Sequence, residues 1–107
     1  MSEFERVTKD VVKRLRDQYA PEKIILFGSY AAGTSQVDSD IDLLIIKQTS
    51  ERFIDRWATV RRLLSDSSRT LALETIVFTP AEVRDKLNRG DQFIKEILEK
   101  GRVLYAA

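Results

Sequence analysis

The stretch LFGSYAAGTSQVDSDIDLLII, residues 26–46, decides the fold. It places Gly28 and Ser29 at the end of one apolar run, and Asp40 and Asp42 at the start of the next. Residues two apart on a strand point to the same face, so these two carboxylates are expected to lie together. Neighbouring like charges in an apolar setting are unfavourable unless a cation compensates them. The stretch therefore predicts a cation site on a strand that follows a glycine-serine turn.

The glycine-serine turn predicts an anion site next to that cation. Glycine lets a ligand approach the backbone closely, and free amides at a helix start attract phosphate. Mg²⁺ commonly takes one or two carboxylates together with substrate phosphates. Gly28 and Ser29 with Asp40 and Asp42 therefore predict a site for a metal-bound nucleoside triphosphate.

The acidic run allows two other interpretations. Residues 38–42 begin like a calcium loop, but Leu43 stands where that loop needs glycine and Thr49 where it needs glutamate. The calcium interpretation is therefore excluded. The alternative that stays open is a solvated turn carrying Asp38 and Asp40, followed by a frayed strand start at Asp42.

The composition narrows the chemistry that is available. The chain has 107 residues, no cysteine and no histidine, which excludes disulfides, thiolate chemistry and histidine general bases. The net charge of +1 gives no overall attraction to nucleic acid, so direct nucleic-acid binding is not expected. No apolar run approaches the ~20 residues of a membrane span, and the polar start resembles no signal peptide. We expect one domain over residues 1–107 and a cytoplasmic protein without membrane contact.

Hydrophobic periodicity and capping residues predict an alternating order of helices and strands. Ser2 with Glu5, and Thr79 with Glu82, fit capping boxes, and Asp91 fits an N-cap. Apolar spacing predicts that Phe53 and Trp57 pack into the core. The expected helices are 3–19, 52–66, 80–88 and 91–100, and the expected strands are 23–28, 40–47, 71–79 and 102–105. This order predicts an α/β (α+β) fold in which helices flank one small sheet.

Gly28-Ser29, ten intervening residues and Asp40-Ile41-Asp42 resemble the signature of nucleotidyltransferases related to DNA polymerase β. The run GSYAAG…SDIDLLI and the small size are similar to the minimal nucleotidyltransferase (MNT) family of HEPN/MNT toxin–antitoxin modules. The resemblance implies a nucleotidyltransferase fold with a small mixed β-sheet, and a third carboxylate on the next strand. In LETIVFTP, residues 73–80, Glu74 occupies that position. Glu74 could instead be an edge-strand residue that faces water or pairs with an arginine.

The resemblance implies a metal-dependent transfer of AMP from ATP to a hydroxyl group, with Asp40, Asp42 and Glu74 as catalytic and metal-binding residues. Gly28 and Ser29 would bind the nucleotide, and two Mg²⁺ ions are expected. The chain ends soon after this core, so the acceptor is expected on a HEPN-domain partner protein, on a tyrosine by analogy. Oligomeric state, homo-oligomer or not, stays open.

Two departures from the family pattern leave other functions open. Glu74 stands where relatives usually have aspartate, and Ala32 stands where they commonly have a phosphate-binding arginine. A non-catalytic antitoxin that acts by binding its partner, or a scaffold that binds nucleotide without transfer, is therefore the alternative.

Overall fold

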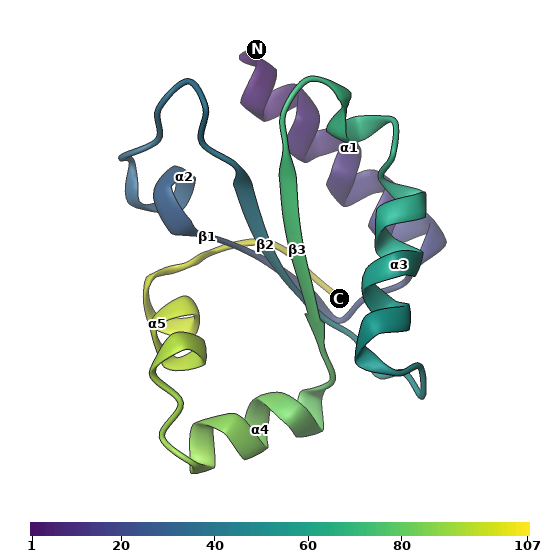
Figure 1. Ribbon diagram of the computed structural model, residues 1–107, viewed down its shortest axis with the longest axis vertical. Coiled ribbons are helices and arrows are strands. Elements are labelled where there is room, and N and C mark those ends of the chain that lie inside the picture. Colours follow the sequence, from purple (N-terminus) through teal and green to yellow (C-terminus); the bar gives the residue numbers. More distant parts are fainter.

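The computed structural model describes all residues, 1–107, and contains four strands that form one sheet in the order β3-β2-β1-β4. The central strands β1 (Lys23–Phe27) and β2 (Ile41–Ile46) are antiparallel. Strand β3 (Leu73–Phe78) runs parallel to β2, and β4 (Arg102–Ala106) runs antiparallel to β1. The predicted mixed sheet and fold class are confirmed, and Figure 1 shows helices on both faces of the sheet.

Helices α1 (Glu3–Gln18) and α3 (Phe53–Leu63) cover one face of the sheet. This face contributes Ile41, Leu43 and Ile45 of β2 to the larger core, where they meet Val11 and Val60. The capping box at Ser2 begins α1 as predicted. The helix predicted over 52–66 is shorter, because it ends at Leu63 and a 3₁₀ turn, Ser67–Arg69, follows it.

Helices α4 (Pro80–Asn88) and α5 (Gln92–Lys100) cover part of the other face. Their buried residues Val83, Ile94 and Ile97 pack on Leu44 and Ile46 of β2. The capping box at Thr79 and the N-cap at Asp91 are both present, as predicted. None of the helices is long and apolar enough to cross a membrane.

The short helix α2 (Gly28–Ala32) directly follows β1 and ends at Gly33, which adopts a left-handed conformation. Because β1 leads straight into α2, the glycine-serine turn lies at the end of β1 that adjoins the start of β2. The candidate site lies at this end of the sheet, on the face that α4 and α5 cover in part (Figure 1).

Candidate active site

Three residues form a row across the sheet: Phe27, Asp42 and Glu74. Asp42 is the register partner of Phe27 on β1 and of Glu74 on β3. Side chains alternate between the faces of a strand, so all three share the face that carries Leu44 and the α4–α5 core. Phe27 packs against that core, whereas Asp42 is partly exposed and Glu74 is exposed. The topology thus brings two acids 32 positions apart to adjacent places on one face.

Asp40 lies directly before β2, which begins at Ile41, so it flanks the row rather than belonging to the strand. Burial raises the pKa of the Asp42 carboxyl, and the negative charges of Asp40 and Glu74 raise it further. The Asp42 carboxylate is therefore within electrostatic reach of both neighbouring acids. Binding of a proton or of a cation reduces the repulsion between neighbouring carboxylates.

The backbone of Gly28 lies next to the Asp42 carboxylate. Its φ angle of +73° is one that glycine adopts readily, and a Cβ added there would overlap the Asp42 carboxylate, with Asp42 Cγ only 3.1 Å away. The carboxylate therefore lies directly against the backbone of the glycine-serine turn. Both the left-handed conformation and the close contact require glycine at position 28.

A cavity of about 580 Å³ opens on the α2 side of the row, between α2 and α5. Gly28, Ser29 and Ala32 form its α2 wall, and Phe93 and Lys100 belong to its α5 wall. The cavity therefore joins both residues of the predicted phosphate turn to a space of ligand size.

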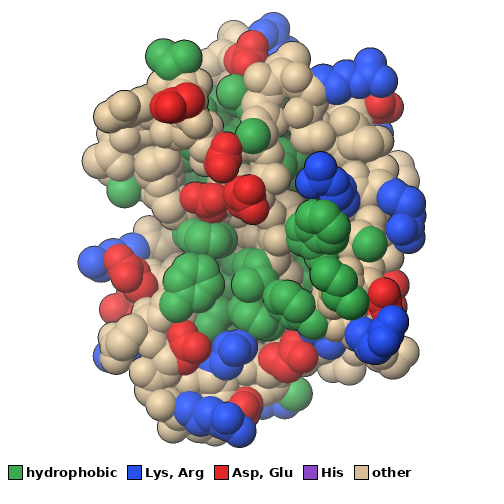
Figure 2. Space-filling view, viewed as in Figure 1, with side chains coloured by type: hydrophobic (Ala, Val, Ile, Leu, Met, Phe, Trp, Pro, Cys, Tyr) green, Lys and Arg blue, Asp and Glu red, His purple; other side chains and the backbone are tan.

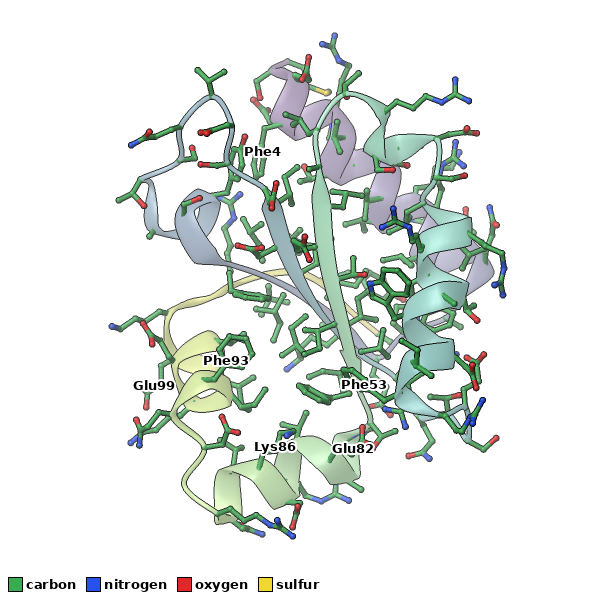
Figure 3. All side chains as sticks on the ribbon, viewed as in Figure 1. Phe4, Phe53, Glu82, Lys86, Phe93 and Glu99 are labelled. Atoms are coloured by element: carbon green, nitrogen blue, oxygen red, sulfur yellow. The ribbon has the colours of Figure 1, made fainter.

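A second hollow, of about 240 Å³, lies on the β3 side of the row and includes Glu74 in its lining. Its walls are largely apolar and come from Phe27, Phe53, Trp57 and Phe93. Figure 2 shows acidic side chains at the centre of this face directly beside a hydrophobic patch, and Figure 3 shows Phe53 and Phe93 approaching that patch from α3 and α5.

The prediction that Phe53 and Trp57 are core residues is wrong. Phe53 is 47% exposed and Trp57 is 39% exposed, and both line the apolar hollow. The buried residues of α3 are instead Val60 and Arg56, and the Arg56 guanidinium pairs with Glu82 at 2.6 Å. A helix at the margin of a sheet buries a narrower stripe than the apolar spacing of its sequence indicates.

No three acidic side chains lie close enough together in the structure to form a cation site by themselves. Mg²⁺ usually takes one or two carboxylates and completes its shell with phosphate oxygens and water, so a magnesium ion here would need further oxygens from a ligand. Asp40, Asp42 and Glu74 are the residues that could supply the carboxylates. The crowding of charge around Asp42 is the feature that favours a cation there.

Two residues of the site were not found from the sequence. The sequence indicates only that Phe27 belongs to the expected strand 23–28 and that Lys100 ends the expected helix 91–100. Lys100 lines the cavity opposite Gly28 although 72 positions separate them. Only the antiparallel pairing of β1 with β4, which follows α5 directly, could have indicated that juxtaposition.

Comparison with known proteins agrees with this fold. Residues 9–107 match the family model described as polymerase beta, nucleotidyltransferase. A Methanocaldococcus jannaschii protein named as a putative protein adenylyltransferase is 35% identical over 103 residues, which cover 94% of this chain and 97% of that protein. The protein adenylyltransferase MntA of Shewanella oneidensis is 38% identical over 56 residues, or 51% of this chain and 40% of MntA.

Among solved structures, the chain is similar to a toxin–antitoxin complex with AMP-PNP, with a TM-score of 0.65 and 25% identity over 94% of this chain and 73% of that one. The structure of a putative nucleotidyltransferase from Sulfolobus solfataricus has the same fold, with a TM-score of 0.62 and 19% identity over 94% of this chain and 78% of that one. From the family model and the full-length relative, the chain belongs to the polymerase beta nucleotidyltransferase family.

Proposed function

We propose that residues 1–107 act as one metal-dependent nucleotidyltransferase domain that moves AMP from ATP to a hydroxyl group of a partner protein. The partner is a HEPN-domain toxin, and this chain is its antitoxin. Relatives named as protein adenylyltransferases support the reaction, and the similar toxin–antitoxin complex with AMP-PNP supports both the nucleotide and the partnership.

The observation that carries the proposal is the contact of the Asp42 carboxylate with the Gly28 backbone, in a row with Glu74. This contact joins an anionic centre to a turn whose residues line a cavity of about 580 Å³. A metal-free polyphosphate would be repelled by the carboxylates, whereas a polyphosphate that carries Mg²⁺ is attracted to them. Adjacent carboxylate and phosphate sites are therefore mutually compatible only for a metal-bound nucleotide.

Asp40, Asp42 and Glu74 would hold the Mg²⁺, for which two ions are proposed, and Gly28 and Ser29 would bind the β- and γ-phosphates. Bound Mg²⁺ supplies charge stabilisation for the triphosphate and lowers the pKa of the attacking hydroxyl. The acceptor oxygen forms a bond to the α-phosphorus, the bond from that phosphorus to pyrophosphate breaks, and the hydroxyl proton leaves to a base. Glu74, the exposed carboxylate of the row, would accept that proton or help to hold a metal ion.

The apolar hollow on the β3 side supports a protein acceptor. It shares Glu74 with the acidic row, and Phe53, Trp57 and Phe93 leave aromatic surface exposed around it. Exposed aromatic surface of this kind favours contact with another polypeptide. A tyrosine of the partner, with its apolar ring and polar hydroxyl, would suit an aromatic hollow that borders a carboxylate.

Transfer is tested by incubating the protein and the HEPN partner with Mg²⁺ and ATP labelled at the α-phosphorus. The wild type is expected to label the partner, and Asp40→Asn and Asp42→Asn to reduce the initial rate by about 100-fold or more, a range typical for the loss of a charge-stabilising group. Glu74→Gln should also slow the transfer. Asp38→Asn is the matched control, since Asp38 is an exposed acid of the same loop, and it should leave the rate unchanged.

Each other outcome assigns a different function. Nucleotide binding without label on the partner would identify a nucleotide-binding scaffold. If Asp40→Asn and Asp42→Asn still inhibit the toxin and no label is transferred, the protein is a non-catalytic antitoxin. That outcome would refute the proposed transferase activity.

A further inference from the structure

The cavity between α2 and α5 contains a single basic side chain, Lys100. Its only acidic lining residue is Glu96, and the rest of the wall is apolar or uncharged. Helix α2 carries no basic residue, because its sequence is Gly-Ser-Tyr-Ala-Ala. The position where the family resemblance leads one to expect an arginine, Ala32, lines the same cavity without a charge. Lys100 is therefore the one group there that can neutralise an anion.

Backbone packing fixes where Lys100 stands. It is the last residue of α5, and the next residue, Gly101, lies so close to β1 that an added Cβ would be 2.6 Å from Ile25 Cγ2 and 3.0 Å from the Leu26 carbonyl oxygen. From Arg102 the chain continues as β4, whose first residue pairs with Leu26. The end of α5 is thus held against the part of β1 that leads into Gly28. Figure 1 shows α2 and α5 on the same side of the sheet.

The present partner of Lys100 is weakly held. Its Nζ lies 3.6 Å from Glu96 Oε1, and the two side chains are 75% and 67% exposed. An exposed pair of this kind on one helix contributes little to stability. The flexible four-carbon stem of lysine can therefore bring the ammonium group from Glu96 to an anion in the cavity at small cost.

We infer that Lys100 binds the β- and γ-phosphates of the nucleotide and so takes the place of an arginine on α2. The inference rests on the proposed function for the identity of the ligand. It predicts that the contribution of Lys100 to binding depends on the number of phosphates. The α-phosphate would lie nearest the carboxylates, and the distal phosphates would extend along α2 towards Lys100. A purely structural role, a positive charge at the C-terminal end of a helix, predicts no such dependence on phosphate number.

Calorimetric titration with two nucleotides separates these roles. The probes are α,β-methylene ATP, whose α–β bridge is not cleaved, and AMP, each with Mg²⁺. Lys100→Gln is expected to raise the Kd for α,β-methylene ATP about tenfold and to change the Kd for AMP less than about twofold, as for one lost charge-assisted hydrogen bond. Lys95→Gln removes the same charge from an exposed position of α5 outside the cavity and should change neither Kd.

Two further variants test whether charge is what matters. Lys100→Arg should keep the wild-type Kd within about threefold, and Ala32→Arg in the Lys100→Gln background should recover most of the lost affinity, since one charge-assisted contact is restored in each. Equal losses for the triphosphate and for AMP, or wild-type binding of the triphosphate by Lys100→Gln, would overturn the inference while leaving the proposed function intact. A folded wild type that does not bind α,β-methylene ATP would instead refute the proposed function itself.

Discussion

At the scale of single residues, Gly28 is the position on which the site depends most directly. Glycine is required there twice, for the φ angle of +73° and for the space that the Asp42 carboxylate fills. Gly33 has nearly the same backbone conformation, φ +76°, but a Cβ added there meets nothing within 4 Å. The two glycines therefore separate the cost of the backbone angle from the cost of the contact.

Gly28→Ala and Gly33→Ala are expected to differ although the substitution is the same. Gly33→Ala should lower the free energy of unfolding by about 1 kcal/mol through backbone strain alone. Gly28→Ala should lower it by about 2 kcal/mol more, because the methyl group displaces Asp42. Thermal unfolding measures both losses, and titration with α,β-methylene ATP should show weaker binding only for Gly28→Ala. Equal behaviour of the two variants would contradict the contact between Gly28 and Asp42.

The sequence predicted the candidate residues of the site better than their surroundings. Gly28, Ser29, Asp40 and Asp42 were identifiable because they are close in sequence and each has a chemical reason to lie at a strand end. Glu74 was identifiable as an acid within an apolar strand. The surroundings, such as Lys100, depend on the approach of distant segments, which local spacing does not encode.

At the scale of elements, an ion pair between buried Arg56 and partly exposed Glu82 joins α3 to the start of α4. Arg56 is 6% exposed, and its guanidinium donates to Glu82 Oε1 at 2.6 Å and to the Val77 carbonyl at 3.3 Å. The same Glu82 oxygen accepts from the Thr79 backbone N–H at 2.8 Å, so the capping box of α4 is part of the link. This link holds α3 and β3, which bear Trp57 and Glu74, in place beside α4.

Glu82→Gln is expected to lower the free energy of unfolding by about 1 to 2 kcal/mol, because the amide keeps the cap but leaves the buried Arg56 charge unpaired. For a protein of this size that is a fall in Tm of about 8 °C. Asp85→Asn is the control, since its pair with Arg89 is exposed and should contribute little. A Tm unchanged by Glu82→Gln would contradict the link.

The difference in stability between wild type and Glu82→Gln depends on pH through the pKa of Glu82. Burial raises it, but the hydrogen bonds from Arg56 and from the Thr79 backbone outweigh burial, and the net shift is downward from the ordinary 4.5. The stability that ionised Glu82 provides is therefore fully present above about pH 4.5 and is lost as the pH falls through the lowered value. The gap in Tm between wild type and Glu82→Gln should accordingly narrow in acid.

The limits of the elements were predictable where a capping residue marks them and less so elsewhere. Ser2, Thr79 and Asp91 begin their helices as predicted. No N-cap side chain marks the start of α3, and the end of that helix was placed three residues too late. The exposure of Phe53 and Trp57 was missed because helical spacing shows which residues share a side, not how far the neighbouring strand extends to cover them.

At the scale of the whole molecule, the sheet order brings together residues that the chain keeps far apart. Parallel pairing of β3 with β2 sets Glu74 opposite Asp42, and antiparallel pairing of β4 with β1 brings the end of α5 to Gly28. The row of Phe27, Asp42 and Glu74 thus has the cavity lined by Lys100 on one side and the apolar hollow on the other. Under the proposed function, the nucleotide would bind on the cavity side of the row and the acceptor on the side of the hollow.

If Asp42 and its neighbouring acids bind a divalent cation together with the polyphosphate, nucleotide binding depends on Mg²⁺. Calorimetric titration with α,β-methylene ATP should give a Kd about tenfold or more higher when EDTA replaces Mg²⁺, as expected when charges are no longer paired. Asp42→Asn should lose this Mg²⁺ dependence, and Asp38→Asn should keep it. An Asp42→Asn variant that binds the nucleotide with the Mg²⁺ dependence of the wild type would contradict the account.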